Sequence, residues 1–183
     1  MAQPCIPAFP KFKSIGIEDR NPIQSAIDRY GPETSEWTFT NLFIWKEYYR
    51  YTWSMHGGHL LILSNPLGWG HYFLQPIGPA NRTQLCLDLL DWLRREKDEI
   101  EPRVERADER LISEIKGHKG FQIDPIPDHF DYVYAARELI ELSGRKFHGK
   151  KNHVNRFLKN HAWEYKPMDA ASAVECVHYL HLW

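Results

Sequence analysis

The stretch that decides the fold is Tyr49–Leu63, YRYTWSMHGGHLLIL. Polar and aromatic residues alternate over 49–53, and the apolar run Leu60–Leu63 is typical of a buried strand. The tetrapeptide His56–His59 contains two glycines, which permit the positive φ angles of a tight turn. Strands joined by such short links pair antiparallel, so we expect a hairpin, with a third strand at Tyr72–Leu74.

Helical patterns surround these strands. Asn21–Pro22 predicts a helix start with Asn as N-cap, and Gly31–Pro32 ends the apolar stripe that follows. The run 37–45 has helical spacing but is rich in aromatic residues, so a helix and a strand both stay open. The most regular helical pattern covers 81–99, and Asp108 predicts the N-cap of a further helix.

The remaining segments complete an α+β pattern. Short strands are predicted at 103–107, 121–126 and 163–165. Arg94, Arg95 and Lys97 close the long helix, and we assign them to its negative dipole end rather than to a ligand site. We therefore expect a central, mostly antiparallel sheet covered by helices.

Composition limits the class of protein. The chain has 183 residues, of which 43% are hydrophobic and 14% aromatic, which predicts an ordered domain with a sizeable core. A net charge of -1 argues against a protein that coats nucleic acid. Three separated cysteines favour a reducing, cytoplasmic setting over a disulfide framework. No apolar stretch approaches the ~20 residues of a membrane span, so we expect a soluble chain.

The stretch most informative for function is Asp131–Phe157, DYVYAARELIELSGRKFHGKKNHVNRF. Tyr132–Ala135 predicts a buried strand, and a short helix should end at Ser143–Gly144. The segment 145–159 then carries six Lys and Arg residues and no Asp or Glu. Unsatisfied N–H groups at a helix start attract phosphate, and cationic side chains add charge-assisted hydrogen bonds. The predicted anion-binding residues are Gly144, Arg145, Lys146, Lys150, Lys151 and Asn152.

Two other interpretations of this basic stretch are possible. The spacing Gly144 to Lys150 fits the P-loop pattern GxxxxGK, but Lys151 stands where Ser or Thr must bind Mg²⁺, so we reject it. The stretch also fits the solvated face of an amphipathic helix that turns Phe147, Val154, Phe157 and Leu158 inward. The anion site and the solvated face both stay open.

Candidates for catalysis and for metal binding are few. His148 lies among the cations and Tyr134 on the predicted strand before them, so both are candidate acid–base residues by position. A tyrosine on a buried strand belongs more often to the core. His56 and His59 have no third ligand nearby in sequence, so we interpret them as a polar turn and expect no metal site.

Several separated motifs carry a resemblance to a known family. FPKFKSIGIEDR at 9–20, SEWTFTNLFIW at 35–45, the stretch 131–157 and AVEC at 173–176 resemble the phosphatidylglycerol lysyltransferase C-terminal-domain family of bacteria, in its stand-alone soluble branch. The resemblance implies two tandem GNAT-like domains, related to Fem-type aminoacyl transferases. Residues 1–167 would form the first domain and 168–183 the start of the second. Membrane members move an aminoacyl group from aminoacyl-tRNA to a lipid head group.

The expected function is an acyl or aminoacyl transferase module. Acyl-CoA or aminoacyl-tRNA would serve as co-substrate, with no tightly bound cofactor, and tRNA or coenzyme A would be the partner. The helical pattern at 170–183 reaches its end without a cap, which predicts a piece of a longer protein. In the alternative, the chain is a non-catalytic interaction module, whose basic helix and 170–183 helix dock a missing C-terminal half or a second copy.

Overall fold

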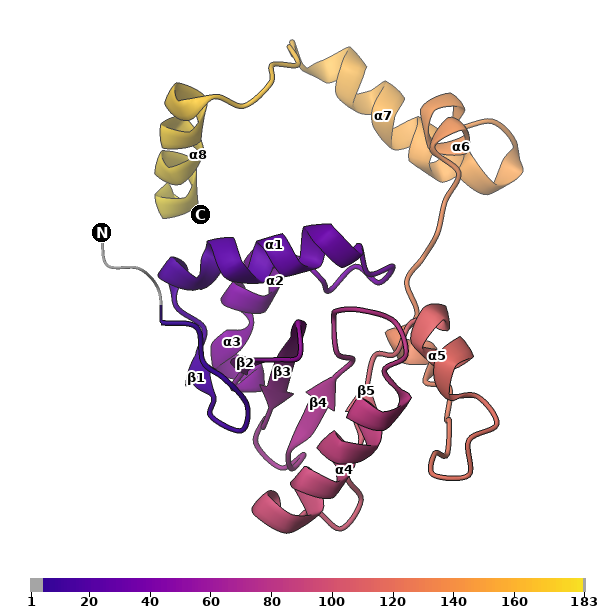
Figure 1. Ribbon diagram of the computed structural model, residues 1–183. Helices are drawn as coiled ribbons and strands as arrows, with labels where there is room; N and C mark the ends of the chain where they lie inside the picture. Colours follow the sequence, from indigo (N-terminus) through magenta and orange to yellow (C-terminus); the bar gives the residue numbers. More distant parts are fainter. Residues whose placement is uncertain (1–4, 183) are drawn as a thin grey trace. The chain divides into compact units, whose positions relative to one another are not determined.

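The computed structural model describes residues 5–182 and divides the chain into two units, Met1–Asp131 (unit 1) and Tyr132–Trp183 (unit 2) (Figure 1). The predicted last helix includes Trp183, which lies outside the described residues. The division at 131 reflects packing, whereas the predicted boundary at 167 concerns the start of a second GNAT-like half. That boundary stays a prediction.

Unit 1 is built around one five-stranded sheet in the order β1-β2-β3-β4-β5. Neighbouring strands are antiparallel, except that β4 and β5 are parallel. The bounds are β1 Lys13–Ser14, β2 Thr52–His56, β3 His59–Ser64, β4 Tyr72–Leu74 and β5 Val104–Glu105. The α+β class and the mostly antiparallel sheet are thus confirmed.

The hairpin of β2 and β3 is the centre of the sheet. Its register runs from Thr52 opposite Leu63 to His56 opposite His59. Gly57 and Gly58 have φ angles of 53° and 82°, the left-handed conformation that a two-residue hairpin turn requires. The Nε2 atom of His59 lies 3.0 Å from the carbonyl oxygen of Pro79, so the ring is hydrogen-bonded to the backbone.

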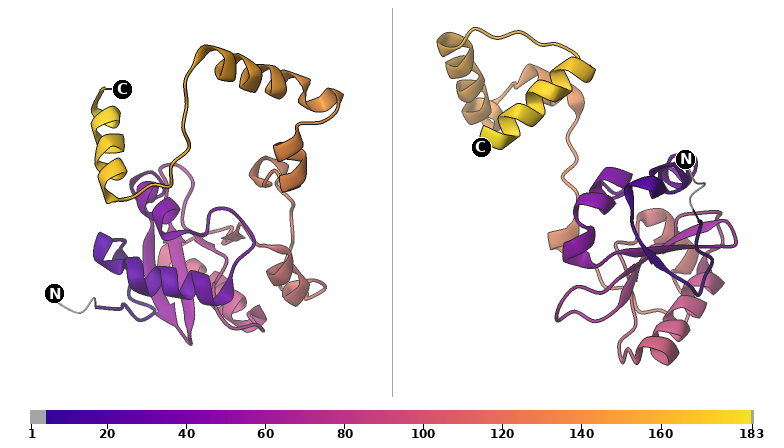
Figure 2. Two further views of the ribbon diagram at one scale, coloured as in Figure 1. Left: turned by 90° about the horizontal axis from the view of Figure 1, so that it is seen from above. Right: turned by 90° about the vertical axis from the view of Figure 1, so that its left-hand side faces the viewer.

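Helices cover both faces of this sheet, with α1 and α2 on one face and α4 on the other (Figure 2). The helical elements of unit 1 are η1 Ile17–Asp19, α1 Arg20–Tyr30, α2 Phe39–Ile44, α3 Lys46–Tyr49, α4 Thr83–Lys97, α5 Glu109–Ile115 and η2 Pro127–His129.

Side-chain caps explain where α2 and α5 begin. Thr38 Oγ1 accepts a hydrogen bond from the Asn41 N–H at 3.0 Å, which resolves the open segment 37–45 in favour of a helix. Asp108 caps α5 as predicted, since its Oδ1 accepts from the Leu111 N–H at 3.0 Å. The N-cap of α1 is Asp19 rather than the predicted Asn21. The Asp19 carboxylate is fully buried and accepts from Trp53 Nε1 at 3.1 Å.

Strand β3 joins the two layers of the core. Leu60 and Ile62 face the cluster under α1 and α2, while Leu61 and Leu63 face the cluster under α4. Successive side chains of a strand point to opposite faces, so a strand buried on both faces reads as a continuous apolar run. This arrangement explains the LLIL sequence that the hairpin prediction used.

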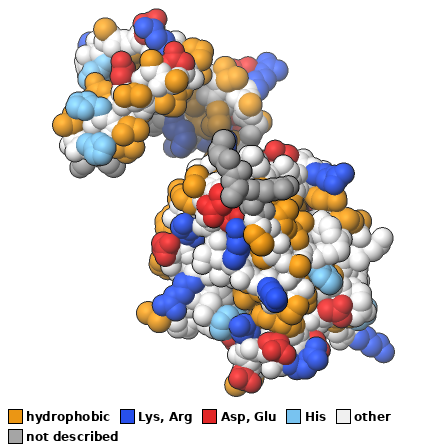
Figure 3. Space-filling view, turned by 60° about the vertical axis from the view of Figure 1, so that its left-hand side comes forward, with side chains coloured by type: hydrophobic (Ala, Val, Ile, Leu, Met, Phe, Trp, Pro, Cys, Tyr) orange, Lys and Arg blue, Asp and Glu red, His pale blue; other side chains and the backbone are white. Residues whose placement is uncertain are grey.

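Unit 2 is helical and has little core. Its elements are α6 Ala136–Glu141, η3 Arg145–Phe147, α7 His148–Asn160 and α8 Ala170–Leu182. Within the described part of this unit, Phe147 is the one buried hydrophobic residue. Figure 3 shows hydrophobic side chains at the surface, and Ile140 and Leu180 are 81% and 71% exposed.

Three predicted strands are not formed. Tyr132–Ala135 is extended but pairs with no strand, and Tyr132 and Val133 are 88% and 90% exposed instead of buried. The segments 121–126 and 163–165 are likewise irregular. Apolar β-branched and aromatic residues favour a strand only where a neighbouring strand supplies hydrogen bonds and packing. Pro125 also lacks the N–H that a ladder requires.

Candidate anion-binding site

The predicted anion site lies at the turn between α6 and α7. Helix α6 ends at Glu141, just before the predicted end at Ser143–Gly144, because Leu142 adopts the left-handed conformation with φ 45°. Gly144 follows with φ 88°, a conformation that L side chains rarely adopt. The chain then enters η3 and α7, whose first turn has no side-chain cap. The N–H groups of Phe147 and His148 already donate to the carbonyls of Gly144 and Arg145. Within the described residues, the N–H groups left for an anion are therefore those of Arg145 and Lys146, at the start of η3.

This turn forms a hollow of about 490 Å³ within unit 2. Three predicted residues line it together with His148, and the full lining is Leu142, Ser143, Gly144, Arg145, His148 and Lys151. His148 and Lys151 are three residues apart on α7, which places both on one helix face. Lys146, Lys150 and Asn152 lie outside this lining.

The cations of this segment differ in their partners. Lys146 Nζ lies 2.7 Å from Glu138 Oε1, so a carboxylate from α6 neutralises this cation. Among the residues that the structure describes, Arg145, Lys150 and Lys151 form no ion pair. Two unneutralised cations, Arg145 and Lys151, thus border the hollow. Charge-assisted hydrogen bonds from such groups to phosphate are about twice as strong as neutral ones.

The catalytic candidates are only partly assembled. His148 borders the hollow, whereas Tyr134 lies outside its lining and is half exposed. Over residues 5–182, no carboxylate is hydrogen-bonded to the His148 ring. A general base is normally oriented by such a partner, so the described site has a candidate base without its orienting group.

No group of three or more His, Cys, Asp or Glu side chains lies close enough to hold a metal ion in the described structure. His178 and His181 both lie on the exposed helix α8.

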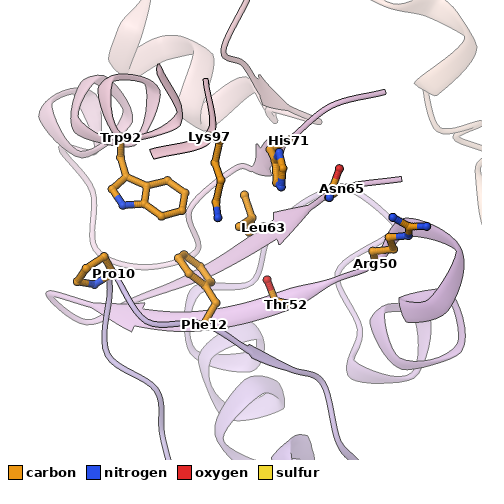
Figure 4. A pocket seen from close by; sticks show the side chains of 9 residues that line it. All are labelled: Pro10, Phe12, Arg50, Thr52, Leu63, Asn65, His71, Trp92 and Lys97. Carbon is orange, nitrogen blue, oxygen red and sulfur yellow. The ribbon is translucent and has the colours of Figure 1, made fainter. Parts of the chain in front are cut away.

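A second hollow, which the sequence analysis did not find, lies within unit 1. It has a volume of about 430 Å³ and is lined by Pro10, Phe12, Arg50, Thr52, Leu63, Asn65, His71, Trp92 and Lys97 (Figure 4). These residues come from separated segments, and each alone reads as a surface, turn or core position. The one available signal was Lys97, which the sequence analysis assigned to the helix dipole.

Comparisons with known proteins bear on family and fold. The family model described as "Phosphatidylglycerol lysyltransferase, C-terminal" matches residues 27–183. A crystal structure of a conserved protein of unknown function from Bacteroides thetaiotaomicron VPI-5482 is similar, with 22% sequence identity and a TM-score of 0.67. The match covers 94% of this chain and 58% of that chain, and at this identity it shows the fold alone. No curated protein matches.

None of the helices formed within residues 5–182 is both long and apolar enough to cross a bilayer.

Proposed function

The chain belongs to the phosphatidylglycerol lysyltransferase C-terminal family, and on that premise we propose that it is a GNAT-like acyl or aminoacyl transferase module of the cytoplasm. The donor is an aminoacyl-tRNA or an acyl-CoA. The observation that carries the proposal is the hollow at the α6–α7 turn, which combines the first turn of η3 with the cations Arg145 and Lys151. Both donor classes present phosphate groups, which such a site is suited to hold.

The proposed roles follow from the chemistry of each side chain. Arg145 offers a planar guanidinium for two hydrogen bonds to one phosphate, and Lys151 adds a point charge from α7. Lys150, also on α7, contacts the polyanion outside the hollow, and Lys146 contributes less because Glu138 neutralises it. Gly144 is required here for its φ of 88° rather than for space, since a Cβ added there would meet nothing within 4 Å.

In the transfer step, the acceptor amine or hydroxyl attacks the acyl carbonyl carbon. A new amide or ester bond forms, and the bond from that carbon to the tRNA ribose oxygen or to the coenzyme A sulfur breaks. His148 takes the proton from the acceptor and returns it to the leaving oxygen or sulfur. Residues 1–167 act in this proposal as the first GNAT-like domain and 168–183 begin the second, which supplies the rest of the catalytic groups.

Binding of two probes tests the proposal. Unfractionated tRNA and free coenzyme A are titrated at low salt into the wild-type chain and into the double variant Arg145→Ala/Lys151→Ala. We expect binding that weakens with added salt and falls about tenfold in the variant, because two phosphate contacts are lost.

A matched control removes the same amount of charge elsewhere. The double variant Lys116→Ala/Lys119→Ala changes two exposed lysines of unit 1 and should bind as the wild type does. Equal binding by the wild type and the Arg145/Lys151 variant would contradict the anion site. If the Arg145/Lys151 variant loses binding to one probe and keeps binding to the other, the probe that is lost identifies the donor class.

The exposed apolar residues of unit 2 favour a second candidate function, a non-catalytic interaction module. Val174, Val177 and Leu180 of α8 are 70%, 52% and 71% exposed. A unit of this size cannot bury enough surface alone, so a partner surface is expected to cover them. The partner is a C-terminal GNAT-like half or a second copy of this chain.

Molar mass in solution discriminates these partners. Sedimentation equilibrium should show a dimer that Leu180→Glu dissociates if a second copy covers α8. A monomer at all concentrations would argue against the second copy and leave the C-terminal half as the partner.

A further inference from the structure

The hollow of unit 1 has one apolar wall and one polar wall (Figure 4). Phe12 and Trp92 form the apolar wall, with ring centroids 5.6 Å apart. Both rings also contact Phe73 of β4, which is fully buried. The centroid of the Phe73 ring lies 5.9 Å from that of Phe12 and 5.8 Å from that of Trp92. Packing against the core holds this wall in place before any ligand arrives, which reduces the entropy cost of binding.

Two cations also border the hollow: Lys97 lies beside Trp92, and Arg50 lies at the other end (Figure 4). Arg50 is the C-cap of α3 in the left-handed conformation with φ 50°, and Lys97 is the last residue of α4. Neither takes part in an ion pair with the residues described here. Lys97 Nζ lies 5.3 Å from the centre of the Trp92 ring, so its charge sits at the edge of the apolar wall.

His71 completes the polar wall in a fixed orientation. Glu99 Oε1 accepts hydrogen bonds from the His71 backbone N–H and lies 2.9 Å from its Nδ1. These bonds hold the pKa of the Glu99 carboxyl below its usual range. A side chain at Gly70 would lie 2.7 Å from Glu99 Oε2, so only glycine permits this approach. Glu99 is hydrogen-bonded to His71 and forms no ion pair with Arg50 or Lys97 among the described residues, so these two cations can face a ligand.

From this arrangement we infer that the hollow of unit 1 binds a small organic anion, a carboxylate or phosphate ester with a flat apolar body. The body packs on Phe12 and Trp92, and the anionic group lies between Arg50 and Lys97, with Thr52 and Asn65 as hydrogen-bond donors. A volume of about 430 Å³ suits a ligand of this size. The inference does not depend on the transferase proposal, since unit 1 supplies every residue.

The competing explanation is that both cations only serve the C-termini of their helices. Cations are favourable at such ends whether or not a ligand is present. Under that explanation, the hollow has no preference for an anion over a neutral molecule of the same shape.

The test is a titration of the full ¹⁵N-labelled chain with three probes, followed by NMR chemical shifts. The probes are 3-phenylpropionate, phenyl phosphate and the neutral 3-phenylpropionamide. We expect shifts at the Thr52, Leu63 and Asn65 amides and the Trp92 indole, with at least about tenfold weaker binding of the amide. Whichever of the two anions binds more tightly shows whether the site prefers a carboxylate or a phosphate ester.

Variants locate the binding. Arg50→Asn with Lys97→Gln removes both charges, and Asn tolerates the left-handed conformation at position 50. It should bind the anions at least about tenfold more weakly, while Arg94→Gln with Lys116→Gln, which removes two exposed charges elsewhere, leaves affinity unchanged. Retained ¹⁵N spectra show that each variant is folded. Equal affinity for anion and amide, unchanged binding in the Arg50/Lys97 variant, or no shifts at these four groups would overturn the inference.

Discussion

The ion pair between Arg82 and Glu114 offers the sharpest test of how unit 1 is held together. Arg82 precedes α4 and Glu114 lies in α5, with side chains 8% and 17% exposed. The Glu114 carboxylate accepts from the Arg82 backbone N–H and from Nη2, both at 2.6 Å. We predict that Glu114→Ala destabilises the chain, because it leaves the Arg82 guanidinium nearly buried without its counter-charge.

The magnitude follows from the burial. Removing one partner of a buried ion pair costs about 3–5 kcal/mol, and we expect ~3 kcal/mol since Glu114 is not fully enclosed. With a urea m value of about 2 kcal/mol per M, the midpoint should fall by roughly 1.5 M. Urea unfolding followed by tryptophan fluorescence measures this shift, because Trp37, Trp53 and Trp92 all lie in unit 1.

Two further variants make the measurement decisive. Glu109→Ala removes an exposed carboxylate from the first turn of α5 and should cost only about 0.5 kcal/mol. The double variant Arg82→Met/Glu114→Leu should recover most of the lost stability, because no buried charge remains. If Glu114→Ala and Glu109→Ala unfold at the same urea concentration, the assigned role of this pair is wrong.

The same pair makes stability depend on pH. Burial acts to raise the pKa of Glu114, but hydrogen bonds from Arg82 and its charge outweigh burial and hold the pKa below the ordinary value of 4.5. The unfolded chain therefore binds the proton at higher pH than the folded chain. The stabilisation is complete above about pH 4.5 and is lost as pH falls through the folded pKa. The stability difference between wild type and Glu114→Gln should shrink below about pH 4, and a constant difference down to about pH 3 would contradict this.

Other variants test the cap and the two units. Asp108→Ala should cost about 1–2 kcal/mol because the Leu111 N–H loses its acceptor, and thermal unfolding by circular dichroism measures it. Leu61→Ala should cost about 3 kcal/mol in urea unfolding, since Leu61 is fully buried in β3. Ile140→Ala in unit 2 should cost less than about 0.5 kcal/mol by the same assay, because its side chain is 81% exposed; a cost as large as that of Leu61→Ala would show that another surface covers it.

Much of unit 1 could be predicted because the signals are local. The Gly57–Gly58 turn fixes the hairpin through backbone conformation, and the apolar run of β3 reports burial on both faces. The Asp108 cap follows from a side chain and an N–H three residues apart. In unit 2, the pattern of cations at Gly144–Lys151 is local as well, since residues three or four apart on one helix share a face.

Only the tertiary structure decided the rest. Tyr132–Ala135 has strand composition, yet no neighbouring strand pairs with it, and pairing depends on parts of the chain far away in sequence. Arg82 and Glu114 are 32 residues apart, and the hollow between Arg50 and Lys97 gathers side chains from residue 10 to residue 97. Backbone propensity and capping act over a few residues, so they predict elements. Burial, ion pairs and hollows arise from the packing of those elements, which local sequence patterns do not encode.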